Sequence, residues 1–233
     1  MGQGGITPPP PDPDFPSDIA GLFIHLDASG IAGISDGAAL ATWPDSGPNG
    51  YNLTQATSGN RPLFRASAIG GRPAVEFDGS NDNMAVAFGT TYSQPNTVFV
   101  VVQFVSVPSS ADPYPWMDGN ASSNRHWMGR SSAGQYAIWA GDPFLNSGVA
   151  ASTNPVLVRG VYNGASSSIA INSGTAVNGS TGSTGLSGIK LGSRWDNLRQ
   201  VAVKIAEVVA YNAVLSGTDI GRVESYLRDK YSL

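Results

Sequence analysis

The stretch Thr97–Val105, TVFVVVQFV, decides the fold of this chain. It is apolar at both odd and even positions and rich in β-branched side chains, and Gln103 is its only polar residue after Thr97. A strand with one solvated face alternates polar and apolar residues, whereas a strand buried on both faces is apolar throughout. The stretch therefore predicts a central β-strand that is covered on each side.

Shorter apolar runs, separated by turn residues, lie on either side of this strand. Strands at this spacing are typical of a β-sandwich or β-barrel. Between residues 166 and 178, the turn Asn172-Ser173-Gly174 predicts a β-hairpin. The clearest predicted strands are Leu22–Leu26, Ala74–Phe77, Met84–Phe88, Thr97–Val105, Gln135–Ala140, Val156–Tyr162, Ser168–Ile171, Gly188–Leu191 and Val201–Tyr211.

Helical periodicity is confined to the C-terminal segment. Ser216 or Thr218 is a suitable N-cap, and Lys230 falls in the last turn, where a cation interacts favourably with the helix dipole. The apolar stripe comprises Ile220, Val223, Tyr226 and Leu227. The pattern predicts one helix that packs against an edge or end of the sandwich.

Composition excludes several classes of function. The 233 residues include 13 basic and 17 acidic side chains, giving a net charge of −4 without a basic stripe, so we expect no nucleic-acid partner. There are no cysteines and only two histidines, which excludes thiolate chemistry and a multi-histidine metal site. No apolar run of about 18 residues occurs, so we expect no membrane insertion.

The N-terminal segment is rich in proline. Six of the 16 prolines fall within the first 16 residues. Because proline fixes φ and lacks a backbone donor, residues 1–17 are predicted to be an extended arm in front of a domain at 18–233. A disordered tail is the alternative, but we expect the arm to dock onto a partner subunit. Its predicted docking residues are Pro8, Pro9, Pro10, Pro11 and Phe15.

Three stretches together resemble a known family. They are residues 26–62, with Trp43-Pro44-Asp45-Ser46-Gly47 at their centre; Gly71–Asp82; and residues 205–231, which begin Ile205-Ala206-Glu207. The combination resembles the laminin-G-like jelly-roll domains of the concanavalin A-like lectin and glucanase superfamily, in the form common in bacterial surface proteins and phage structural proteins. The resemblance covers residues 19–233. It implies an all-β, two-sheet antiparallel jelly-roll sandwich with one C-terminal helix.

Two acidic positions are candidates for a structural or a chemical role. Asp78-Gly79-Ser80-Asn81-Asp82 is predicted to be a turn between strands, although its oxygen atoms are also suited to Ca²⁺, which relatives of this fold often bind. Strict alternation from Val201 places Glu207 on the same face as Ile205 and Val209, where a buried carboxylate needs a partner. We expect an arginine or backbone donors to supply it, with a bulge or a catalytic role as alternatives. No metal and no cofactor is predicted, apart from this candidate Ca²⁺ loop.

Catalysis is not predicted. Glucanases of the resembled superfamily carry two carboxylates on one strand face, and such a pair needs even spacing. The chain has only three glutamates, Glu76, Glu207 and Glu224, and Glu76 lacks a second glutamate on its own face. A hydrolase therefore remains a less favoured alternative, as does a lyase that uses His126 as its base.

Aromatic and polar residues gather between Asp112 and Asp142, where three of the five tryptophans lie. Aromatic rings stack on the C–H surfaces of sugars and neighbouring polar groups bind hydroxyls, although the same rings also suit a protein interface or the core. Alternation predicts that Trp127 and Trp139 share one face. The candidate ligand residues are Trp116, Asp118, Arg125, Trp127, Tyr136 and Trp139.

Together these observations predict a non-catalytic phage virion protein, such as a capsid-decoration, head-fibre or tail component. It would lie at the virion surface, dock through its arm onto another virion protein or a second copy of the chain, and display a lectin-like face to cell-surface polysaccharide. The alternative is an exported bacterial carbohydrate-binding domain that acts outside the cell or at its surface.

Overall fold

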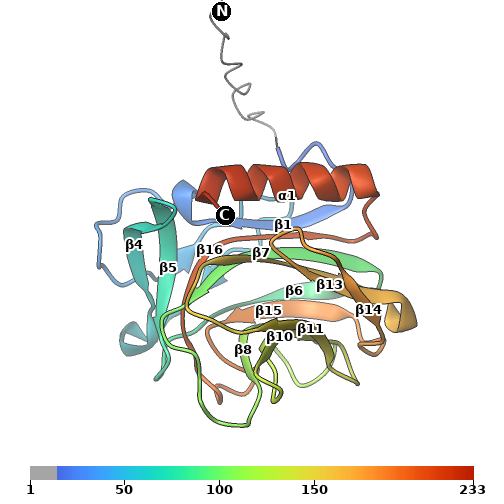
Figure 1. The fold of residues 1–233 in the computed structure, drawn as a ribbon. Helices are drawn as coiled ribbons and strands as arrows, with labels where there is room; N and C mark the ends of the chain where they lie inside the picture. The colour runs from blue at the N-terminus through green and yellow to red at the C-terminus, as the bar shows by residue number, and fades with distance from the viewer. Residues whose placement is uncertain (1–14) are drawn as a thin grey trace, which may run out of the picture.

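The computed structural model describes residues 15–233, which form two antiparallel β-sheets and one C-terminal helix (Figure 1). The predicted two-sheet antiparallel sandwich with a single C-terminal helix is therefore confirmed. Pro8, Pro9, Pro10 and Pro11 lie outside the described residues, so their predicted docking role stays a prediction.

The first sheet has eight strands in the spatial order β14-β13-β12-β7-β16-β5-β4, with β1 paired to β16 beyond the end of β5. The second sheet also has eight strands, in the order β11-β10-β9-β8-β15-β6-β3-β2. The first-sheet strands are β1 (Leu22–Asp27), β4 (Leu63–Ile69), β5 (Arg72–Asp78), β7 (Asn96–Phe104), β12 (Val156–Tyr162), β13 (Ser167–Ile171), β14 (Val177–Gly179) and β16 (Ala202–Tyr211). The second-sheet strands are β2 (Thr42–Trp43), β3 (Leu53–Thr54), β6 (Met84–Tyr92), β8 (Tyr114–Asp118), β9 (Trp127–Arg130), β10 (Gln135–Trp139), β11 (Leu145–Ala150) and β15 (Leu186–Leu191).

The strand predicted to be central is β7, which lies between β12 and β16. Its two faces enter two different cores. Val98, Val100, Val102 and Phe104 point into the core between the sheets. Phe99 and Val101 point the other way, into the core beneath the helix. Because both faces are buried, the side chains that point to either face of β7 are apolar, and the sequence does not alternate between polar and apolar residues.

The helix α1 (Gly217–Tyr231) lies across the first sheet on the side away from the second sheet (Figure 1). Ser216 is the N-cap, and its side chain accepts a hydrogen bond from the backbone N–H of Asp219. The predicted apolar stripe packs onto the sheet, where its members Val223 and Leu227 are fully buried, and Tyr231 extends the buried side of the helix beyond the predicted stripe. Burying a side chain of this size contributes about 1.5–3 kcal/mol relative to leaving it in water. No helix within residues 15–233 has the length and apolar composition needed to cross a membrane.

The described end of the predicted arm packs on the chain's own helix. The ring of Phe15 lies 4.9 Å from that of Tyr226, and the guanidinium group of Arg222 lies 5.5 Å from the Phe15 ring centroid. Arg222 also pairs with Asp18. Phe15 therefore contacts the chain's own helix, and its predicted role in docking a partner stays a prediction.

Candidate functional site

The outer face of the second sheet presents the predicted aromatic residues that lie outside the core. β9 and β10 are antiparallel, and Trp127 stands directly opposite Trp139. Three other side chains of these two strands point the opposite way, into the core: Met128, Tyr136 and Ile138. The prediction that the two tryptophans share a face is confirmed.

A β-bulge brings Asp118 to this same face. The register of β8 against β9 shifts between Pro115 and Met117, so that Trp116 and Met117 both enter the core. The next residue, Asp118, then stands opposite Lys190 of β15 on the outer face. Without the bulge, alternation would direct Asp118 into the sandwich.

The carboxylate of Asp118 is fully buried and accepts four hydrogen bonds. Arg125 donates from Nε at 2.9 Å and from Nη2 at 2.6 Å, and the backbone N–H groups of Gly119 and Trp195 donate at 2.8 and 3.1 Å. Burial raises the pKa of Asp118 above its usual range, and the hydrogen bonds and charge of Arg125 offset part of that rise. This one side chain therefore fixes both Arg125 and the backbone of Trp195.

Lys190 holds the other side of the loop that carries Trp195, which follows β15. Its ammonium group donates to the carbonyl oxygen of Trp195 at 3.0 Å and to Oδ1 of Asn197 at 2.6 Å. The loop also places Asn197 and Arg199 at positive φ, 62° and 56°, a conformation that non-glycine residues rarely adopt. The backbone of Trp195 is thus bound at its N–H by Asp118 and at its C=O by Lys190.

The result is a stack of three side chains, Trp139, Arg125 and Trp195, which we call the tryptophan–arginine stack. The Arg125 Cζ atom lies 5.1 Å from the Trp139 ring centroid and 5.8 Å from that of Trp195. Phe144 extends the row, with its ring centroid 6.2 Å from that of Trp139. Trp139, Trp195 and Phe144 are all half-buried, so aromatic surface remains accessible beside a guanidinium donor. Such a surface suits the stacking of sugar rings with hydrogen bonds to their substituents.

The structure divides the six predicted ligand residues into two groups. Asp118, Arg125, Trp127 and Trp139 gather on the outer face, although Trp127 is only 2% exposed. Trp116 and Tyr136 are 0% and 1% exposed and pack with Phe104 in the core, so their assignment as ligand residues was wrong. Alternation would place Trp116 and Asp118 on one face, and the bulge in β8 separates them by turning only Asp118 outward. Tyr136 lies three residues before Trp139 in β10 and therefore points to the opposite, inner face.

Sequence reasoning missed Trp195 and Lys190. Trp195 lies 77 residues from the carboxylate that holds it, in a turn with no apolar pattern around it. Its only local signal was the aromatic residue itself within Arg194-Trp195-Asp196-Asn197.

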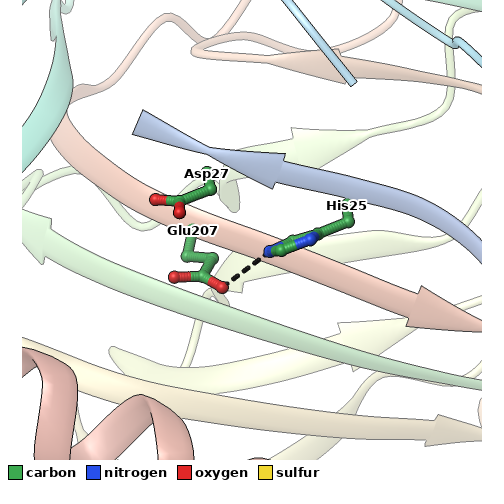
Figure 2. A group of neighbouring side chains, drawn as sticks. All are labelled: His25, Asp27 and Glu207. Carbon is green, nitrogen blue, oxygen red and sulfur yellow. Dashed lines mark hydrogen bonds and ion pairs between the residues drawn. The ribbon is translucent and has the colours of Figure 1, made fainter. Parts of the chain in front are cut away.

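A second cluster lies beneath α1, where His25, Asp27 and Glu207 point toward one another from β1 and β16 (Figure 2). Their ligand atoms lie within 4.8 Å of one another, a spacing that would suit a metal ion. Lys230 binds both carboxylates, however, with Nζ at 2.6 Å from Glu207 Oε2 and 2.8 Å from Asp27 Oδ2. The lysine ammonium takes the place of a cation, so this cluster anchors the helix.

Glu207 is buried and paired as expected, although its partners differ from the predicted arginine or backbone donors. It interacts with Nε2 of His25 at 2.8 Å and accepts hydrogen bonds from Lys230 and from the hydroxyl of Tyr231, the latter at 2.9 Å. A register shift between Ile205 and Glu207 also turns it away from the face of Ile205. The strict alternation assumed for this strand was therefore wrong.

The candidate Ca²⁺ loop is an Asx-type turn between β5 and β6. Asp78 Oδ1 accepts hydrogen bonds from the backbone N–H groups of Ser80, Asn81 and Asp82. Asp82 Oδ2 in turn accepts from the N–H of Asp78 at 3.0 Å, and burial raises the pKa of Asp82 to about 6. The predicted turn is present, and Ca²⁺ binding stays a prediction.

The proposed lyase base, His126, is fully buried within the sandwich. Its ring stacks on Tyr162 at 4.0 Å, and Nε2 donates to the carbonyl oxygen of Thr184 at 3.1 Å. Burial lowers the pKa of His126 to about 3, so the ring is neutral. Its position in the core leaves no path for a substrate to reach it.

No protein-family model matches the sequence, and no curated protein matches it significantly. Solved structures do share the fold. A Trypanosoma rangeli sialidase in complex with sialic acid is 16% identical over 88% of this chain, with a TM-score of 0.60. Domain 4 of a GH43 extracellular arabinanase from Geobacillus stearothermophilus, in complex with arabinotriose, is 14% identical over 88% of this chain, with a TM-score of 0.56. The binding domain of Paraclostridial Mosquitocidal Protein 1 is 12% identical over 88%, with a TM-score of 0.62.

The extent of the likeness differs among these three. This chain spans 33% of the sialidase chain, 52% of the toxin binding domain and 98% of the arabinanase domain. What this chain shares with the three structures is therefore the fold, a β-sandwich.

These likenesses contradict the predicted non-catalytic phage virion protein. The sialidase and the arabinanase that share this fold are glycoside hydrolases. The prediction that the chain is not an enzyme rested on a missing second glutamate. That pair is required in one arrangement of hydrolases, whereas sialidases, for example, use a tyrosine nucleophile. The missing glutamate therefore did not justify excluding catalysis.

Proposed function

We propose that this chain binds glycans through the tryptophan–arginine stack on the outer face of the second sheet, in a jelly-roll domain of the laminin-G-like, concanavalin A-like type. Its ligands would be polysaccharides met outside the cell or at its surface. The observation that carries the proposal is the double restraint on Trp195, whose N–H and C=O are held by Asp118 and Lys190.

That restraint matters because preorganised groups bind with a smaller entropic cost. Ordering a mobile aromatic side chain on binding costs about 0.5–1.5 kcal/mol. In this chain, buried charges already hold the loop that carries Trp195, and the bidentate ion pair with Asp118 fixes Arg125. Two aromatic faces and one guanidinium group are therefore presented together before a ligand arrives.

A second line of support comes from a solved domain of the same size. The arabinanase domain that this chain covers almost completely was solved in complex with arabinotriose. The sandwich is therefore compatible with sugar binding in a domain of this length, and the location of the site in this chain rests on its own residues.

Titration of the full chain with soluble polysaccharides, including arabinan, tests this proposal by calorimetry. Trp139→Ala and Trp195→Ala are each expected to weaken binding at least tenfold, as removal of a central aromatic contact does at other interfaces. The matched control is Tyr51→Ala, which removes a half-buried ring beside β3, at the far end of the same sheet, and should leave the affinity unchanged.

Two outcomes would overturn the proposal. Failure of the unmodified chain to bind any glycan would exclude the function, and native affinity in both tryptophan variants would exclude the site. The release of reducing sugar during the same titrations measures whether a bound glycan is also cleaved.

A further inference from the structure

Arg125 has one edge of its guanidinium group bound and another edge free. Nε and Nη2 donate to Asp118, and the rings of Trp139 and Trp195 flank the group. Nη1 makes no hydrogen bond to any of residues 15–233, and it is not among the buried polar atoms that lack a partner. Nη1 is therefore accessible, between two aromatic rings, for a hydrogen bond to a ligand.

The charges around the stack leave one cation uncompensated. Asp118 is paired with Arg125, and Asp196 is paired with Arg194 at 2.5 Å. Lys190 is 7% exposed, and within the described part of the chain no carboxylate oxygen lies within 4.0 Å of its Nζ. Its two hydrogen-bond acceptors, the Trp195 carbonyl and the Asn197 amide oxygen, are both neutral. Asp118 and Asp196 also interact electrostatically with Lys190, but each is already paired with an arginine, so three cations share two carboxylates around the stack. The remaining positive charge favours the approach of an anion.

We propose that the ligand of the tryptophan–arginine stack is a glycan that carries carboxylate groups, with one carboxylate accepting from Nη1 of Arg125 and attracted by Lys190. This inference rests on the proposed glycan-binding function and specifies its ligand class. Guanidinium groups bind carboxylates with short, charge-assisted hydrogen bonds, and the neighbouring rings cover the apolar faces of the sugar. A neutral glycan has the rings available to it but gains nothing from the Lys190 charge.

The sharpest test changes the ligand and leaves the protein intact. Polygalacturonate and its chemically carboxyl-reduced form differ in the carboxylate and share the backbone, so both are titrated into the full chain at low and at high salt. We expect the native polymer to bind at least tenfold more tightly at low salt, and the difference to shrink at high salt because ions screen the attraction. Polysialic acid is titrated in parallel to separate a sialic acid source of the carboxylate from a uronic acid source.

Two protein variants test the contribution of Lys190. Lys190→Met removes the charge and should abolish most of the preference for the native polymer, whereas Lys190→Arg keeps the charge and should retain it. Leu198→Ser, on the same loop and 55% exposed, is the control that should change neither affinity. If Lys190→Met does not fold, the comparison of the two polymers still decides the question.

The outcomes separate this inference from the proposed function. Equal binding of the native and reduced polymers, or tighter binding of neutral arabinan than of either acidic polymer, would overturn the carboxylate inference and leave glycan binding in place. Failure of all of these polymers to bind would overturn both.

Discussion

Both outer faces of the sandwich carry a fully buried carboxylate, and the two are satisfied in different ways. On the first sheet, Glu207 is bound by Lys230 and Tyr231, which come from the helix α1. On the second sheet, Asp118 is bound by Arg125 and by the backbone of Trp195, which come from loops. In each case a β-bulge turned the carboxylate outward.

The source of the partners decides what each face does. Because the helix brings apolar side chains along with Lys230, the face around Glu207 is closed, with Val223, Leu227 and Tyr231 fully buried. The loops around Asp118 bring Arg125 and Trp195 and leave their rings and donors half-buried. A similar electrostatic arrangement therefore fastens a helix on one face and holds half-buried aromatic side chains on the other, where we propose that glycans bind.

The largest expected effect is the loss of Glu207. In Glu207→Ala, Tyr231 and His25 lose their buried acceptor and Lys230 keeps only Asp27, so we expect the free energy of unfolding to fall by about 3–5 kcal/mol. Urea denaturation measures it. The control is Glu76→Ala at the half-exposed pair with Arg65, with an expected loss below about 1 kcal/mol. Equal losses in the two variants would show that the buried cluster does not fasten the helix.

Asp118→Ala should cost less stability but affect two properties. We expect a loss of about 2–4 kcal/mol, because Arg125 and the N–H of Trp195 lose their acceptor. Glycan affinity should also fall at least tenfold, whereas Glu207→Ala should keep its affinity under conditions where it is folded. Calorimetric titration of both variants makes the comparison. Unchanged affinity in Asp118→Ala would break the distinction between the two faces.

The smallest expected effect is on the titration of the two buried lysines. Burial lowers the pKa of Lys190 below its usual 10.5. Burial acts on Lys230 too, but the charges of Glu207 and Asp27 outweigh it and raise the pKa. NMR titration of the side-chain ammonium groups, assigned with the Lys→Arg variants, should place the two on opposite sides of 10.5.

The two lysines also have opposite effects on stability as the pH rises. Lys190 binds its proton more weakly in the folded chain, so its contribution to the free energy of unfolding increases as pH rises through its lowered pKa toward 10.5. Lys230 binds its proton more tightly when folded, so its contribution is lost as pH rises above 10.5. The same pKa for both lysines would contradict the assigned difference in their surroundings.

Several features followed directly from local sequence patterns. The two-sided burial of β7, the stripe of α1 with its Ser216 cap, and the turn at Asn172-Ser173-Gly174 all depend on residues close together in the chain. The shared face of Trp127 and Trp139 followed from alternation within one hairpin. Short strands such as β2 and β3, with two residues each, carry too little pattern to be predicted.

The errors in the candidate site have two origins. Trp116 and Tyr136 were assigned to the ligand surface because aromatic and polar residues gather in that stretch of the sequence, whichever face each of them occupies. Glu207 was placed on the face of Ile205 because strict alternation was assumed through a position where the register shifts. A single bulge exchanges the two faces of a strand for every residue after it. Nothing in the local composition of Tyr114–Asp118 or Ala202–Tyr211 marks where the shift occurs.

The sequence by itself determined that the chain folds as a sandwich around β7 with a helix at its end. The spacing of apolar residues within each of these elements indicates whether it is a strand or a helix and which of its faces is buried. Only the tertiary structure decided what the buried carboxylates do. Their partners lie far away along the chain, 182 residues between His25 and Glu207 and 77 between Asp118 and Trp195. Contacts over such separations depend on strand register and loop geometry, which local sequence patterns do not encode.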